Sequence, residues 1–188
     1  MALRGTRATL LSVWGGMVLR HSPCRLIMKS GSGRISGNGD RTTMTIHMDA
    51  DALARFMAQE FPQVAGDLTV GNPDATGLTV SLTTGDQHLR PGGTVSGPTL
   101  FTLADVAFYL LILSRIGPEA LTVTTNATIN FMRKPAPGVI FGDARILKQG
   151  KSLIVGDVII YNSGDFKRLA PVAQAQMTYS VPPTRGRS

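Results

Sequence analysis

The chain has 188 residues, 43% of them hydrophobic and 16% charged, which fits one globular domain with a buried core. Its formal net charge of +7 would suit a nucleic acid or an acidic membrane as partner. However, residues 1–43 hold seven basic and one acidic side chain, net +6, whereas residues 44–188 hold twelve and eleven, net +1. The body is therefore nearly neutral, and we expect neither nucleic acid nor membrane as its partner. Cys24 is the single cysteine, so no disulfide can form within the chain. This is compatible with a reducing compartment.

Residues 1–43 are rich in Arg, Ser and Gly and contain one acidic residue. This composition allows an organelle transit peptide, a weak secretory signal, or an extension that arises from the choice of start codon. We favour the last, or a disordered extension without a part in the chemistry, because Met44 opens the stretch where globular patterning begins. We therefore interpret 1–43 as a basic extension and 44–188 as the domain. The expected location is cytoplasmic, or mitochondrial if the extension is a transit peptide.

The domain opens with a predicted helix and a predicted strand. MDADALARFMAQEFP has the spacing of a short amphipathic helix, which Asp49 or Asp51 can cap and which Pro62 follows. The stretch GLTVSLTT then alternates, with Leu78, Val80 and Leu82 on one side, and this alternation predicts a strand.

The next element is an unusually apolar helix within residues 90–114, where Asp105 is the only charge between the two ends. Ser96 or Gly97 is its expected N-cap, with Pro98 at the first helical position. Arg115 complements the helix dipole in the last turn, and the pair Gly117-Pro118 ends the helix. Because nearly every side is apolar, other structure should surround this helix.

Four β-type segments follow without helices between them, which predicts an antiparallel sheet and the α+β class. One face of TVTTNATINFM should carry Val123, Thr125, Ala127, Ile129 and Phe131. Residues 138–162 indicate two strands joined by a turn at KQGK, and PVAQAQMTYSV should place alternate residues on one face: Ala173, Ala175, Met177 and Tyr179.

The usual catalytic motifs are missing from this sequence. It contains no GxSxG elbow, no P-loop, no dinucleotide fingerprint and no Cys/His cluster with zinc spacing, so we expect no metal and no cofactor. A lone carboxylate such as Asp105 is costly to bury in an apolar stretch unless it is used or paired. Two interpretations are open: Asp105 is a base whose pKa burial would raise, or it is a structural carboxylate that Thr hydroxyls and Asn amides cap, so that it holds the helix to the sheet. The Gly97 N–H at the helix N-terminus favours an oxyanion. The two groups lie about 12 Å apart on one helix, so a second, antiparallel copy would have to bring them together.

The stretch SGPTLFTLADVAFYLL resembles the signature of hotdog-fold acyl-CoA thioesterases of the phenylacetic-acid-degradation (PaaI) type. The family pattern N-x-x-G-x-x-H-G-G is followed after six residues by the acidic residue, commonly within L-A-D. Here Gly93 and Gly97 match two glycines, and Asp105 ends the LAD triplet. The later stretches INFMRKP and ARILKQGKSLIVGDVIIYN are also similar to the family, so the resemblance covers about residues 45–182.

This resemblance implies a hotdog fold, in which five or six antiparallel strands wrap one helix. It also implies dimers with two sites at the interface, often paired into tetramers. Asp105 would then be general base or nucleophile, Gly97 the oxyanion donor, and Thr124 (or the less well matched Thr125) a residue that helps to hold the water. The expected reaction is hydrolysis of a small or medium acyl-CoA or aryl-CoA.

Two departures from the family pattern concern the loop before the helix. Arg90 occupies the family's asparagine position, and Ser96-Gly97-Pro98 replaces H-G-G. We place Arg90 and Ser96 among the substrate-binding residues, although Arg90 could instead pair with Asp105 across the interface. That pairing would suit the alternative function, a non-catalytic acyl-CoA-binding or assembly module. A hotdog dehydratase ranks lower, because it usually needs a histidine beside the acid.

Coenzyme A carries phosphates, which need cationic partners. Candidates follow the NFM strand and flank the predicted hairpin turn: Arg133, Lys134, Lys148 and Lys151. We assign Arg133, Lys134 and Lys151 to substrate binding. Phe131, Tyr109 and the methionines are interpreted as core residues rather than as pocket residues.

Overall fold

The computed structural model describes residues 45–165 and 167–183, so the predicted basic extension over residues 1–43 lies outside the described residues. The elements in chain order are α1 (Ala50–Glu60), α2 (Pro62–Ala65), β1 (Leu68–Val70), β2 (Leu78–Thr83), the 3-10 helix η1 (Asp86–His88), β3 (Leu89–Arg90), β4 (Thr94–Val95), α3 (Gly97–Ile116), β5 (Val123–Phe131), β6 (Val139–Gln149), β7 (Leu153–Asn162) and β8 (Ala173–Ser180).

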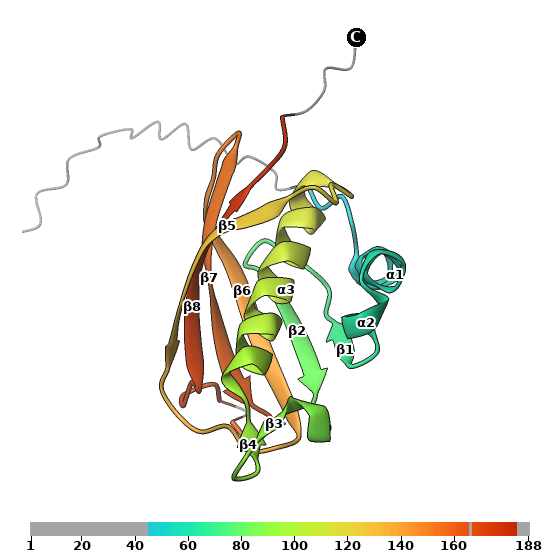
Figure 1. The fold of residues 1–188 in the computed structure, drawn as a ribbon. Coiled ribbons are helices and arrows are strands. Elements are labelled where there is room, and N and C mark those ends of the chain that lie inside the picture. Colours follow the sequence, from blue (N-terminus) through green and yellow to red (C-terminus); the bar gives the residue numbers. More distant parts are fainter. Residues whose placement is uncertain (1–44, 166, 184–188) are drawn as a thin grey trace, which may run out of the picture. The chain divides into compact units, whose positions relative to one another are not determined.

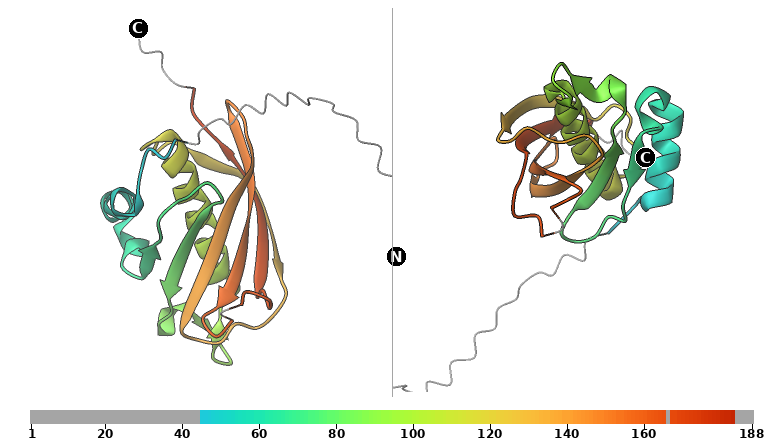
Figure 2. Two further views of the ribbon diagram at one scale, coloured as in Figure 1. Left: turned by 180° about the vertical axis from the view of Figure 1, so that it is seen from behind. Right: turned by 90° about the horizontal axis from the view of Figure 1, so that it is seen from below.

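The strands form one six-stranded antiparallel sheet in the order β1-β2-β6-β7-β8-β5, and β3 pairs with β4 separately. The sheet curves around α3, and α1 and α2 lie beside β1 and β2 (Figures 1 and 2). The α+β prediction, an antiparallel sheet around one long apolar helix, is confirmed. Strand β5 follows α3 in the sequence and forms one edge of the sheet. It pairs with the last strand, β8, rather than with β6, the next strand along the chain.

Helix α3 is the centre of the core. Its fully buried side chains include Leu103, Phe108 and Leu111, each contributing about 1.5–3 kcal/mol of burial free energy. By length and composition alone α3 could cross a membrane, but 72% of its most apolar window is buried inside the described fold. Gly156 on β7 allows the sheet to approach the helix, because a Cβ there would lie 2.1 Å from Phe108 Cε2 and 2.3 Å from the Arg145 carbonyl oxygen.

The ends of the helices agree with the predicted signals, with one shift. Asp49 caps α1 by accepting from the Ala52 N–H at 2.8 Å. Ser96 caps α3, and Gly117 follows its last residue. Pro98 stands at the second helical position, after Gly97, rather than at the first as predicted. Both positions lack an intrahelical partner for the N–H, so proline is tolerated at either.

Strand β5 contains a bulge that corrects the predicted alternation. Thr124 lies opposite Tyr179 and Asn126 lies opposite Thr178, so Thr125 is the extra residue. A bulge reverses which side chains face the helix on one side of it. Ala127, Ile129 and Phe131 keep the predicted face, but Thr124 joins them in place of Thr125. The prediction for β8 is confirmed, since its four alternate residues are buried: Ala173, Ala175, Met177 and Tyr179.

Candidate active site

Asp105, in the third turn of α3, accepts hydrogen bonds from two hydroxyl groups of the sheet. Thr124 Oγ1 on β5 donates to Asp105 Oδ1 at 2.7 Å, and Tyr179 Oη on β8 lies 2.6 Å from the same oxygen. Tyr179 Oη also lies 3.0 Å from the Asp105 carbonyl oxygen, but it has one hydrogen to donate, and the shorter contact is to the carboxylate. The half-buried carboxylate is therefore held by hydrogen bonds and has no cationic partner among the described residues.

Tyr179 is a site residue that the sequence interpretation missed, because it was assigned only to the inner face of its strand. Burial raises the pKa of Tyr179, and the negative charge and hydrogen bond of Asp105 raise it further. The phenol consequently stays protonated at neutral pH and acts as a donor. The signal in the sequence is weak: a single tyrosine ends an inward face that otherwise carries Ala and Met.

A cavity of about 330 Å³ opens beside the Asp105 carboxylate. Its other walls are largely apolar and come from α1, α2, α3 and the start of β5: Met57, Phe61, Val64, Val106, Tyr109 and Val123. Met57 and Tyr109 were interpreted as core residues rather than as pocket residues. Each is less than 10% exposed and so belongs to the core, but each also lines this cavity. The carboxylate therefore faces a space suited to an apolar group.

The second candidate group, the Gly97 N–H, lies at the N-terminus of α3. Ser96 Oγ accepts from the Thr99 N–H at 3.3 Å, as a capping side chain does. The Gly97 N–H has no acceptor among the described residues, so it is available to a ligand oxygen. The partial positive charge of the helix end adds to its preference for an anion.

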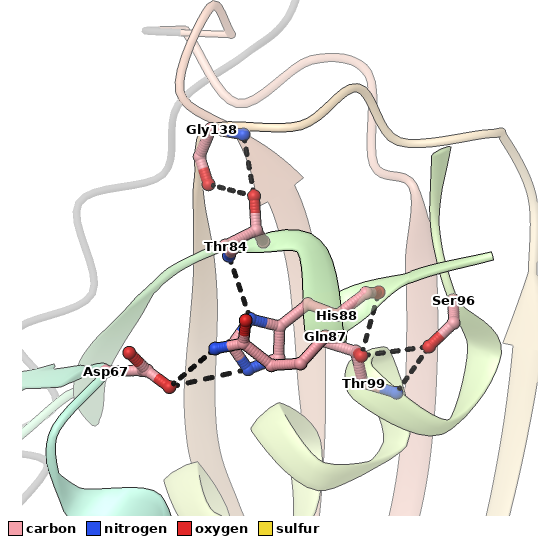
Figure 3. Close-up of polar contacts among 8 residues, drawn as sticks. Asp67, Thr84, Gln87, His88, Ser96, Thr99 and Gly138 are labelled. Atoms are coloured by element: carbon pink, nitrogen blue, oxygen red, sulfur yellow. Dashed lines mark hydrogen bonds and ion pairs between the residues drawn. The ribbon is translucent and has the colours of Figure 1, made fainter. Parts of the chain in front are cut away.

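A hydrogen-bond network fixes the segment that leads to Gly97 (Figure 3). The His88 carbonyl accepts from the Ser96 N–H at 2.9 Å and from Thr99 Oγ1 at 3.1 Å. The imidazole of His88 accepts from the Gly85 N–H at Nδ1, 2.9 Å away, and its Nε2 lies 3.5 Å from Asp67 Oδ2. His88 thus ties the turn to the β1–β2 side of the domain through both its backbone and its ring.

Gly97 opens onto a cavity of about 430 Å³ with a cationic rim. Three predicted substrate-binding residues line it with Gly97: Arg90, Arg133 and Lys134. Phe131, interpreted as core, is 55% exposed and also lines this cavity. The Arg90 guanidinium donates from Nε to Thr94 Oγ1 at 2.8 Å, so within one chain it has a partner other than Asp105.

Two further predicted substrate-binding residues lie elsewhere. Ser96 lines a different cavity, on the His88 side of the turn, and its hydroxyl is engaged with Thr99. Lys151 lies in the turn between β6 and β7. That turn is at the end of the sheet where β5 begins, since Leu153 pairs with Ser180 and Ser180 with Val123. Arg133 follows the other end of β5, so one chain does not bring Lys151 together with the cationic rim (Figure 1).

In the part of the chain that the structure describes, no group of three or more His, Cys, Asp or Glu side chains could hold a metal ion. The chemistry on hand is a carboxylate, two hydroxyls that hold it, a backbone donor and a cationic rim.

Known proteins resemble this chain in sequence and fold. The thioesterase superfamily model matches residues 92–167. A candidate thioesterase from Silicibacter sp. TM1040 is 45% identical, and the match covers 76% of this chain and 97% of that one with a TM-score of 0.68. The PaaI protein of the E. coli phenylacetic acid degradation operon is 25% identical over 70% and 92% of the chains, with a TM-score of 0.60.

A thioesterase-like protein from Streptococcus pneumoniae TIGR4, solved with coenzyme A, shares the fold at 22% identity, with 72% and 100% coverage and a TM-score of 0.60. No curated protein matches the chain. The 45% identity over nearly all of the Silicibacter protein, together with the superfamily match and the likeness to PaaI, shows that this chain belongs to the thioesterase superfamily, as a PaaI-type hotdog thioesterase.

Proposed function

We propose that this thioesterase hydrolyses a small or medium acyl-CoA, or an aryl-CoA, with Asp105 as the reacting carboxylate. The observation that carries the proposal is the Asp105 carboxylate, held by two hydroxyls on the wall of an apolar cavity. A carboxylate so placed can take a proton from water or attack a carbonyl carbon.

In the general-base route, the carboxylate takes a proton from a water molecule, and the water oxygen bonds to the thioester carbonyl carbon. The Gly97 N–H stabilises the oxyanion that forms on the carbonyl oxygen. The C–S bond then breaks, and the leaving thiolate receives the proton, which gives a carboxylic acid and free coenzyme A. In the nucleophilic route, Asp105 attacks the carbon itself, expels the thiolate, and forms an anhydride that water hydrolyses.

Both routes need Gly97 and Asp105 at one thioester, although one α3 separates them by about 12 Å. We propose that a second copy supplies the missing group. Strand β5 supports this arrangement, because it lies at the edge of the sheet, contains no charged residue and is largely exposed. An uncharged exposed edge is a template for pairing with another chain. Thr124 lies on this strand, so the pairing would place the partner next to Asp105.

The Gly97 cavity supports coenzyme A as the leaving group. Arg90, Arg133 and Lys134 surround the donor that would hold the carbonyl oxygen. Guanidinium and ammonium groups bind phosphates through charge-assisted hydrogen bonds. The pneumococcal protein of the same fold was solved with coenzyme A, and we propose the same carrier here.

The cavity beside Asp105 supports the acyl assignment. It is lined by Met57, Phe61, Val64 and Tyr109, so it favours an apolar acyl or aryl group over a charged one. Its volume of about 330 Å³ is at the lower end of small-molecule sites. A short or medium chain or a single ring is therefore the proposed cargo.

The test is a panel of acyl-CoA and aryl-CoA thioesters with detection of the free thiol, on the wild type and on Asp105→Asn. We expect hydrolysis of apolar substrates of moderate size, and a loss of kcat of about 1,000-fold in the variant, since general acid–base catalysis contributes 100- to 10,000-fold. The variant should keep its dimer and its circular dichroism spectrum. A wild type inactive on every thioester, or a variant with most of its activity but a much lower Tm, would favour the non-catalytic binding module.

A further inference from the structure

The two oxygens of the Asp105 carboxylate have different surroundings. Oδ1 receives Thr124 Oγ1 at 2.7 Å and Tyr179 Oη at 2.6 Å, whereas Oδ2 has no hydrogen-bond partner among the described residues. We propose that Tyr179 is a positioning residue: with Thr124 it fixes Oδ1 of Asp105, so that Oδ2 is the oxygen that reacts. This inference rests on the proposed function, and it applies to the general-base and the nucleophilic route alike.

The position of Tyr179 is rigid. Its side chain is 2% exposed, and its ring packs edge-on against Phe108 at 5.5 Å and stacks with Tyr109 at 6.2 Å between centroids. Phe108 and Tyr109 belong to the same helix as Asp105, one turn further along. The hydroxyl is thus delivered by a ring that the core holds in place, rather than by a mobile surface side chain.

The second donor is placed by the bulge in β5. Because Thr125 is the extra residue, Thr124 lies directly opposite Tyr179 and turns to the helix face. The two hydroxyls come from neighbouring strands and converge on one oxygen. This convergence fixes the rotation of the carboxylate and orients Oδ2 with it.

Both hydroxyls act as donors. A hydroxyl group has one hydrogen, and an ionised carboxylate only accepts. Burial and the nearby carboxylate keep the phenol of Tyr179 protonated, so it cannot take over the proton from Asp105. With two donors on Oδ1, the lone pairs available to water or to a thioester carbon are those of Oδ2.

The first test is Tyr179→Phe, which removes one oxygen atom and keeps the ring in its aromatic contacts. We expect kcat to fall about 10- to 100-fold with KM nearly unchanged, because a displacement of the reacting group by about 1 Å can lower the rate by about 100-fold. The matched control is Tyr161→Phe on β7. Tyr161 lies on the other face of the sheet, and the described residues that donate to Asp105 are Thr124 and Tyr179 alone. The control should keep wild-type kcat.

A second pair of variants guards against a purely structural effect. Thr124→Ser keeps the hydroxyl and should retain most of kcat, whereas Thr124→Val keeps the branched shape and should lose about 10-fold or more. A packing role for Thr124 would give the opposite order. Wild-type kcat in Tyr179→Phe, in a wild type that does hydrolyse thioesters, would overturn the inference and leave the proposed function intact.

The third test does not depend on activity. In a crystal structure of the wild type, a water molecule or the carbonyl end of a non-hydrolysable thioester analogue should lie against Oδ2, with both hydroxyls on Oδ1. A ligand or water bound to Oδ1, or a Tyr179 hydroxyl turned away from the carboxylate, would overturn the inference even if no thioester were hydrolysed.

Discussion

The Gly97 turn and the Asp105 carboxylate lie on the same helix, yet they are built in opposite ways. The turn offers a backbone N–H with a cationic rim, and its supporting hydrogen bonds come largely from residues 85–99. The carboxylate lies in an apolar cavity, and its supporting hydroxyls come from strands 19 and 74 residues away in sequence. One region is suited to phosphates and an oxyanion, the other to an acyl group and a proton transfer.

Under the proposed function, neither region is a complete site. A thioester needs a polarised carbonyl oxygen and a base at the same carbon. The helix holds these two groups apart, and the uncharged edge of β5 beside Thr124 offers a place where a second chain could join them. We therefore expect changes in the two cavities to have different kinetic consequences.

Removing the Gly97 N–H should have the larger effect. Gly97→Pro deletes the donor at the first helical position, where no intrahelical hydrogen bond is lost, and we expect kcat/KM to fall about 100-fold, as when an oxyanion donor is removed. The matched control is Gly97→Ala, which keeps the N–H and whose Cβ would lie 3.4 Å from Phe131, an ordinary contact. Steady-state kinetics on both variants check this. Equal losses in the two would point to steric disturbance of the turn instead of a lost donor.

Removing the cationic rim should have a smaller effect, and mainly on KM. For the double variant Arg133→Gln/Lys134→Gln we expect KM for a CoA thioester to rise about 10-fold, because charge-assisted bonds to phosphate are lost. The KM for an N-acetylcysteamine thioester, which has no phosphate, should not change. The double variant Lys148→Gln/Lys151→Gln removes the same charge at the opposite end of the sheet. A rise in KM in this second variant as large as in the first would show that the rim does not carry the phosphate binding.

The sequence was sufficient for the features that depend on local signals. The cap at Ser96, the end of α3 at Gly117 and the inner face of β8 follow from capping and from period-two patterning. The same reasoning missed β1, α2, β3 and β4, because elements of two to four residues show no period.

The candidate site was predictable only in part. Asp105 is the single charge of its stretch, and Gly97 follows from its place at a helix start, so both could be named in advance. The bulge at Thr125 arises from the pairing of β5 with β8, and the Tyr179 contact joins residues far apart in sequence. Neither can be read from one segment. The separation of Lys151 from Arg133 is of the same kind, since only the sheet register shows that they lie at opposite ends of the sheet.

In the proposed mechanism, Gly97 of one subunit works with Asp105 of another. Subunit complementation tests it most directly, with Asp105→Asn and Gly97→Pro chains carrying different tags, co-expressed and purified as the mixed dimer. Each homodimer should be nearly inactive. The mixed dimer holds one site with both native groups and one site with neither, so we predict about half of the wild-type turnover per dimer. A mixed dimer no more active than the two homodimers would contradict the pairing of Gly97 and Asp105 across subunits.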